Sequence, residues 1–186
     1  FSEIYGEGKF GLSFELYPPK NAEGEDSLFR VLPRLAAFRP SLITCTYGAG
    51  GSTRDKTLGI LARVRAEFRV SVATHLTCVG STKNQLESFL DEAVSKGIEN
   101  IVALRGDPPR GETAFVQPEG GLGHADELVS LIRQQQPGLG IAVAGYPEKH
   151  QEAKNLAEDL KFLKKKVEAG AHAVITQLFY VNRDFF

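Results

Sequence analysis

The feature that most constrains this chain is a regular alternation of short apolar segments with longer amphipathic ones. Six runs of four to seven mostly apolar residues recur, and this is the length of a buried strand. They are residues 12–16, 42–46, 70–76, 101–104, 141–144 and 173–178. Their starts lie about 30 residues apart, stretching to about 40 only before residue 141. Alternation of this kind predicts an α/β fold with a parallel sheet and right-handed crossovers.

The segments between these runs carry helical patterns. Two apolar stripes are expected to face the core, namely Leu86, Phe89, Leu90 and Ala93, and Leu156, Leu160, Leu163 and Val167. Ser52 and Ser81 are expected N-caps, and Gly97 and Gly170 are expected C-caps. Pro33 is expected to kink the first long helix or to end it early.

Two architectures fit this rhythm, the open doubly wound sheet and the closed eight-stranded (βα)8 TIM-type barrel. The near-constant spacing favours the barrel. A full barrel needs about 200–250 residues, so six strands in 186 residues would form a truncated one. If the fold is a barrel, residues 1–186 form a single α/β domain that lacks the last two βα units. The chain contains no methionine, even at position 1, and we expect a fragment of something longer.

Charge and composition exclude several classes of partner. The chain has 22 basic and 23 acidic residues, so no overall positive field attracts nucleic acid or an anionic membrane. No apolar run approaches the roughly 18 residues that span a bilayer. Two cysteines form no disulfide framework, which favours a cytoplasmic protein. The spacing of Cys45, His75 and Cys78 fits no standard zinc pattern, so buried structural cysteines are the expectation.

Polar side chains follow every expected strand. In both architectures, ligands bind beyond the carboxyl ends of the strands. In chain order these residues are Glu15; Thr44, Thr46 and Tyr47; His75 and Thr77; Arg105 and Asp107; Tyr146 and His150; Gln177 and Tyr180. Polar residues at six of six strand ends predict one large, polar-lined site.

Glu15 lies within an apolar and aromatic stretch, and two interpretations stay open. It could cap a helix or pair with an arginine. Alternatively, burial against Phe14, Leu16 and Tyr17 could keep it protonated as a general acid. The prolines at 18–19 would stiffen the exit of the strand and fix the carboxyl group.

Arg105 and Asp107 point the same way if both lie in a strand. They could form an ion pair, or they could offer a donor fork and an acceptor to a ligand. Residues 106–122 then form a long loop rich in proline and glycine, and loops longer than about 12–15 residues are usually functional.

Two further segments could hold an anion. Residues 47–53 are glycine-rich and link a strand to a helix, so they could cradle an anion or form a flexible turn. They lack the Gly-Lys-Ser/Thr of a nucleotide-binding P-loop. The lysines at 164–166 could clamp phosphate or could form a solvated helix face.

Six segments together resemble the methylenetetrahydrofolate reductase family. They occur in the family's order and span nearly the whole chain: residues 13–20, 46–52, 74–78, 104–109, 146–150 and 175–180. The resemblance implies an eight-stranded α/β barrel, so we expect residues 1–186 to be a single catalytic α/β barrel domain that lacks the last two βα units. It also implies that substrate contacts come from two further strands that this sequence does not contain.

The resemblance implies roles for individual residues. Glu15 matches a catalytic general acid, and Asp107 matches an aspartate near flavin and folate. Gln177 matches a glutamine that meets folate and nicotinamide. The implied cofactor contacts are Thr46, His75, Arg105, Gly106, Asp107, His124, Ala125, Tyr146, His150, Ala153, Asp159, Lys165 and Lys166.

The implied activity is reduction of 5,10-methylenetetrahydrofolate to 5-methyltetrahydrofolate by hydride transfer from NAD(P)H through bound FAD. This reaction belongs to one-carbon metabolism and methionine biosynthesis, and we expect a homo-oligomer. One alternative is a truncated barrel homologue that binds flavin or folate without turnover. Another is a flavin-free barrel lyase or aldolase, which would want a Schiff-base lysine at a strand end, where the sequence offers none.

Overall fold

A computed structural model describes residues 1–46, 54–108, 111–112 and 114–186. Its centre is a sheet of six parallel strands that follow one another in chain order. The strands are β1 (Ser13–Leu16), β2 (Leu42–Cys45), β3 (Ser71–Thr77), β4 (Asn100–Leu104), β5 (Gly140–Gly145) and β6 (Ala173–Thr176). All six expected strands are confirmed, with ends that differ by no more than two residues.

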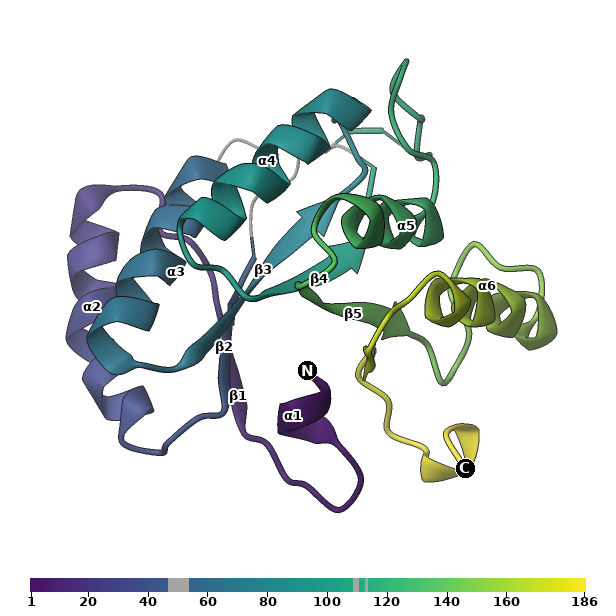
Figure 1. Cartoon of the computed structure of the whole chain (residues 1–186). Helices are drawn as coiled ribbons and strands as arrows, with labels where there is room; N and C mark the ends of the chain where they lie inside the picture. Colours follow the sequence, from purple (N-terminus) through teal and green to yellow (C-terminus); the bar gives the residue numbers. More distant parts are fainter. Residues whose placement is uncertain (47–53, 109–110, 113) are drawn as a thin grey trace.

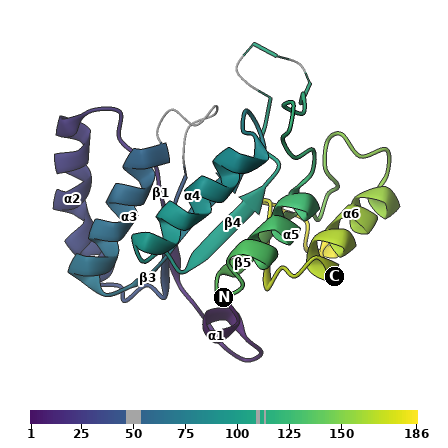
Figure 2. The ribbon, with the colours of Figure 1, turned by 45° about the horizontal axis from the view of Figure 1, so that its top comes forward.

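Helices connect the strands and lie in a row along one side of the curled sheet (Figures 1 and 2). They are α2 (Ala22–Ala36), α3 (Arg54–Phe68), α4 (Lys83–Ser95), α5 (Ala125–Gln135) and α6 (Leu156–Glu168). A short helix, α1 (Ser2–Tyr5), lies on the other side of the sheet, and a 3-10 turn (Asn182–Asp184) lies near the carboxyl terminus. No helix among the described residues has both the length and the apolar composition to cross a membrane.

Alternate residues of each strand point to opposite faces of the sheet, and this gives two cores. The outer core packs strand residues such as Ile43, Val72 and Ile101 against helices α2 to α5. The inner core is smaller and consists of Phe1, Leu42, Ala73, Val102 and Ala142. Ile4 of α1 packs on the inner core, so the amino-terminal helix covers its base.

Local sequence signals explain the helix ends. Thr82 caps α4, with its side chain accepting from the Gln85 amide, so the cap lies one residue beyond the expected Ser81. Gly97 directly follows the C-cap of α4 with φ of +78°, the backbone shape that favours glycine. Pro33 lies inside α2, which ends three residues later. The expected cap Ser52 lies outside the described residues.

The expectation that the whole apolar stripe of α6 faces the core is wrong. Leu156, Leu160 and Val167 are 45%, 52% and 47% exposed, and Leu163 packs against the outer core. The reason is that α6 packs mainly on α5 and β5, and Leu156, Leu160 and Val167 remain largely exposed beside these contacts. The α4 stripe, by contrast, is fully buried as expected.

Candidate active site

The carboxyl ends of the six strands meet at one edge of the sheet, and the expected site residues gather there. Glu15 of β1 is in register with Thr44 of β2, which is in register with Ala73 of β3. His75 follows Ala73 by two residues and therefore shares its face. The Glu15 Oε2 lies 3.2 Å from the His75 Nε2, so the two side chains meet across β2 on the inner face.

The expected burial of Glu15 against Phe14, Leu16 and Tyr17 is wrong. Its side chain is 45% exposed. Strand alternation sends Leu16 into the outer core and leaves Glu15 on the inner face, while Tyr17 is itself largely exposed. The carboxylate instead pairs with His75, which is only 15% exposed. Burial lowers the pKa of His75, and the nearby Glu15 charge opposes that shift without reversing it.

Arg105 follows β4, and its partner is not the expected Asp107. Its Nη1 donates to Glu152 Oε2 at 2.6 Å, and its Nη2 donates to Glu152 Oε1 at 2.7 Å. This bidentate bond raises the pKa of Arg105 and lowers the pKa of Glu152. Asp107 is exposed and reaches Arg105 through its charge alone. Sequence reasoning missed Glu152, because nothing in the pattern links two residues on different loops.

The segment between β5 and α6 carries three further expected residues, Tyr146, His150 and Ala153, and a fourth, Asp159, lies in the first turn of α6. The rings of Tyr146 and His150 meet edge to face with centroids 4.7 Å apart. The His150 amide donates to Asp159 Oδ2 at 3.2 Å, and the Glu152 amide donates to His150 Nδ1 at 3.2 Å. Because Nδ1 accepts, the neutral ring carries its proton on Nε2. The carbonyl of Ala153 accepts from the Lys149 ammonium, which ties the turn together.

A second cluster joins the start of α5 to α6. His124 occupies the N-cap position of α5, directly before Ala125, but its side chain makes no cap hydrogen bond. Instead, its ring stacks on Phe162 with centroids 6.0 Å apart. The Lys165 ammonium lies 5.3 Å from the centroid of the same Phe162 ring. The arrangement presents two nitrogen-bearing side chains around one aromatic ring.

The three consecutive lysines of α6 face different surroundings, since successive helical residues point about 100° apart. Lys164 pairs with Glu168 in solvent. Lys165 reaches Phe162, whereas the Lys166 ammonium donates to the Ala144 carbonyl at 2.5 Å. Burial lowers the pKa of Lys166. The run is therefore neither wholly a solvated face nor wholly a phosphate clamp.

The remaining expected residues also lie at the strand ends. The Thr46 amide extends the β1–β2 pairing by donating to the Leu16 carbonyl, and the Gln177 amide donates to the Gly145 carbonyl. The Gln177 side chain is exposed. Gly106 has φ of +90°, and a Cβ at this position would lie 2.7 Å from the Val79 Cγ1. The glycine-rich segment 47–53 lies outside the described residues.

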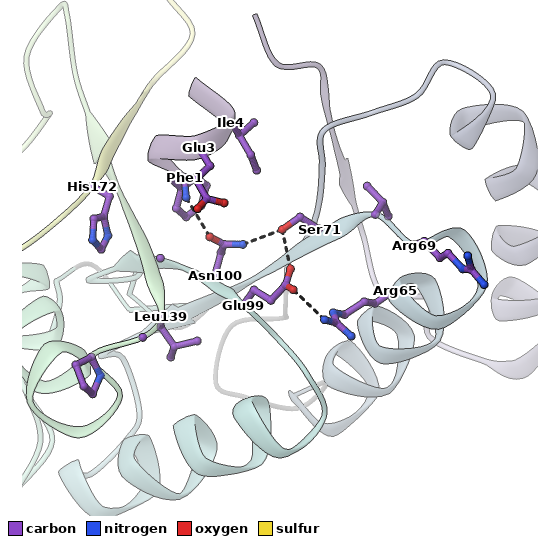
Figure 3. Close-up of a pocket in the computed structure, with 14 residues that line it drawn as sticks. Phe1, Glu3, Ile4, Arg65, Arg69, Ser71, Glu99, Asn100, Leu139 and His172 are labelled. Atoms are coloured by element: carbon purple, nitrogen blue, oxygen red, sulfur yellow. Dashed lines mark hydrogen bonds and ion pairs between the residues drawn. The ribbon is translucent and has the colours of Figure 1, made fainter. Parts of the chain in front are cut away.

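A pocket of about 770 Å³ lies at the opposite, amino-terminal end of the strands (Figure 3). Its polar wall is a chain of contacts in which Arg65 donates to Glu99, and Ser71 donates to Glu99 and accepts from Asn100. The amino terminus of Phe1 donates to Asn100 at 3.3 Å. None of the expected site residues lines this pocket, so it is separate from the candidate site.

Both buried cysteines are thiols, as expected. Cys45 and Cys78 are free, and burial raises the pKa of each to about 12. The Cys78 Sγ donates to the carbonyls of Leu104 and His124. These contacts support β4 and the start of α5 from the outer core, so the thiols have a packing role in the described structure.

Comparisons with known proteins agree with one another. A family model described as methylenetetrahydrofolate reductase matches residues 1–186. Methylenetetrahydrofolate reductase (NADH) 1 of Zea mays is 44% identical over 194 residues, which cover 99% of this chain and 32% of that protein. The 5,10-methylenetetrahydrofolate reductase of Escherichia coli is 38% identical over 174 residues, covering 94% of this chain and 56% of that protein. The chain thus spans about a third to a half of these relatives.

Solved structures show the fold alone. A phosphonopyruvate hydrolase complex with oxalate and Mg²⁺ aligns with a TM-score of 0.67 at 10% identity, over 95% of this chain and 60% of that chain. An aldolase named QR15 aligns with a TM-score of 0.59 at 14% identity, over 94% of this chain and 71% of that chain. The six strands therefore form a curled half-barrel, consistent with part of a TIM barrel.

Proposed function

The chain belongs to the methylenetetrahydrofolate reductase family, and we propose that it forms the reducing site of such an enzyme. The reaction is reduction of 5,10-methylenetetrahydrofolate to 5-methyltetrahydrofolate, with FAD as cofactor and NAD(P)H as hydride donor. The observation that carries the proposal is the Glu15–His75 pair on the inner face, at the same sheet edge as Arg105 and the Tyr146–His150 pair.

The donor set of this edge fits a dinucleotide such as FAD. Arg105 and Lys165 supply the positive charge that a pyrophosphate requires, and the outer ring nitrogen of His150 supplies an N–H donor. Tyr146 adds an aromatic surface beside them. Thr46, Gly106, Ala125, Ala153 and Asp159 complete the proposed set of contacts around the mouth. Lys166 belongs to this set only if it leaves the Ala144 carbonyl.

Bound flavin would supply two-electron hydride chemistry, and the chain's own residues would handle the folate. Ring opening of methylenetetrahydrofolate needs a proton on the nitrogen that leaves. We assign this proton to Glu15, whose Oε2 faces the inner surface. His75 stays neutral because burial lowers its pKa, and its Nε2 lies 3.2 Å from the carboxyl group. His75 therefore orients Glu15 without carrying a competing charge.

Asp107 and Gln177 complete the proposed substrate site. Ring opening leaves a cationic folate, and the exposed carboxylate of Asp107 can stabilise that charge. The amide of Gln177 both donates and accepts hydrogen bonds, so it can serve folate and nicotinamide in turn. A homo-oligomeric, cytoplasmic enzyme of methionine biosynthesis stays a prediction, as does the choice between NADH and NADPH.

The alternative is a homologue that binds flavin or folate without turnover. The half-exposed Glu15 favours it, since a general acid works best in a water-poor site.

Three measurements on the purified protein separate these functions. FAD binding is measured by flavin fluorescence, flavin reduction by NADH or NADPH in anaerobic stopped flow, and reoxidation by methylenetetrahydrofolate in the same instrument. Success in all three supports the reductase. FAD binding without reoxidation supports the non-catalytic alternative, and a protein that binds no FAD contradicts both the reductase and a flavin-binding module.

A further inference from the structure

The contact between Arg105 and Glu152 joins two parts of the candidate site that are far apart in sequence. Arg105 follows β4, whereas Glu152 lies in the segment between β5 and α6. Both carboxylate oxygens are used, at 2.6 and 2.7 Å. The Arg105 side chain is 22% exposed and the Glu152 side chain 53% exposed, so the pair sits at the rim of the mouth. Exposed ion pairs contribute little to the free energy of folding, so we interpret this pair by how it orients the two side chains.

Glu152 leaves Arg105 able to bind a ligand. A guanidinium has five N–H donors, and the bidentate bond uses one on Nη1 and one on Nη2. The ring of Phe115 lies 5.0 Å from the guanidinium carbon and covers one face. The Nε hydrogen and the second hydrogens of both Nη atoms remain for another acceptor. The side chain is thus held from one end and one face, with its other edges available.

The backbone of Glu152 also supports a second candidate residue. Its amide donates to His150 Nδ1, which leaves the proton of the neutral ring on Nε2. The His150 amide is in turn held by Asp159 of α6. One residue therefore orients both Arg105 and His150, and it connects the end of β4 to the segment before α6.

We propose that Glu152 is a positioning residue that presets Arg105 and His150 for the phosphates of a dinucleotide. This inference rests on the proposed function, in which FAD occupies this edge of the sheet. The opposite interpretation is that the Glu152 carboxylate takes the place of the ligand phosphate and must be displaced. The two interpretations predict opposite effects of removing the charge.

The test compares Glu152→Gln with Glu148→Gln in FAD titrations followed by flavin fluorescence. Glu148 is a matched control because it is exposed in the same segment and its side chain forms no hydrogen bond or ion pair with the described residues. We expect Glu152→Gln to weaken FAD binding by about five- to tenfold, because Arg105 loses its anchor. Glu148→Gln should stay within about twofold of wild type. Unchanged or tighter binding by Glu152→Gln overturns the inference.

A double-variant cycle separates positioning from a general effect on the loop. In an Arg105→Gln background, Glu152→Gln should change FAD affinity by less than about twofold, because the carboxylate has no guanidinium to position and the backbone amide that holds His150 is kept in both variants. A loss that is equally large in both backgrounds overturns the inference. Wild-type protein that binds no FAD rejects the proposed function and this inference with it. If the wild-type and Glu152→Gln proteins bind FAD equally tightly, the inference is rejected and the proposed function is not.

A readout without FAD completes the test. Amide hydrogen exchange across residues 146–155 should become faster in Glu152→Gln and not in Glu148→Gln, since only the former releases the segment from Arg105. Equal exchange in the two variants overturns the inference that the Arg105–Glu152 contact holds this segment against the end of β4.

Discussion

Gly106 offers the sharpest test of how the candidate site is held in place. It separates Arg105 from Asp107, and its φ of +90° lies in the region that residues with a Cβ rarely adopt. A Cβ built there would lie 2.7 Å from Val79 Cγ1 and 3.0 Å from Thr77 Cβ. The neighbouring strand end therefore leaves no room for a side chain at this position.

The magnitude of Gly106→Ala follows from these two effects. The backbone conformation costs a residue with a Cβ about 1–2 kcal/mol. Forcing a methyl group into filled space costs about 1–3 kcal/mol more. We therefore expect the free energy of unfolding to fall by about 2–5 kcal/mol. Arg105 and Asp107 must shift with the backbone, so we also expect FAD affinity to fall.

Gly120→Ala is the matched control, measured in the same urea denaturation series. Gly120 belongs to the same loop and also has positive φ, +66°, but an added Cβ there meets nothing within 4 Å. It should therefore cost about 1–2 kcal/mol, the backbone part alone. If the free energy of unfolding falls by the same amount in both variants, the close contact with Val79 and Thr77 adds no destabilisation, and the reasoning is refuted.

Three further predictions concern the site and its supports. Glu15→Gln should retain FAD binding and reduction by NAD(P)H but slow folate reduction by about 10² or more, and equal losses in both half-reactions would contradict the acid role. The free energy of unfolding should fall as the pH drops below 6.5, the ordinary pKa of histidine. Burial lowers the pKa of His75 in the folded protein, so below this pH the unfolded chain takes up a proton that the folded chain does not. His75→Gln should therefore make the free energy of unfolding, measured by urea denaturation, less dependent on pH. Cys45 and Cys78 should react with a disulfide reagent at pH 8 only after unfolding, since burial raises both pKa values to about 12; rapid labelling of the native protein would show that they are accessible.

The sheet and the edge that carries the site could be predicted from the sequence, for physical reasons. Strands β2 to β5 are mostly buried on both faces and are therefore largely apolar, so their runs are visible in isolation, and the regular spacing of the runs points to β1 and β6 as well. Parallel pairing then places every carboxyl end on one edge, which brings Glu15 to His75 without any knowledge of contacts.

What could not be predicted depends on neighbours that the local sequence does not encode. The exposure of Glu15 is set by what covers the inner face, and the partner of Arg105 is set by the path of a loop 47 residues away. The inward turn of Lys166 left no signal in the sequence, because the three lysines lie between Leu163 and Val167, where a helix with one apolar stripe leaves three consecutive positions for polar residues.

The order of the strands has a consequence for how the chain reaches this shape. Each of the strands β2 to β6 is hydrogen-bonded to the strand synthesised just before it, so each can pair as soon as it has been synthesised. Each step closes a loop of about 30 residues, whose entropy cost is modest. As the ribosome releases successive βα units, each can dock on the edge already in place. Assembly can therefore keep pace with synthesis, and the rim that collects Glu15, His75 and Arg105 is built side chain by side chain in the order of translation.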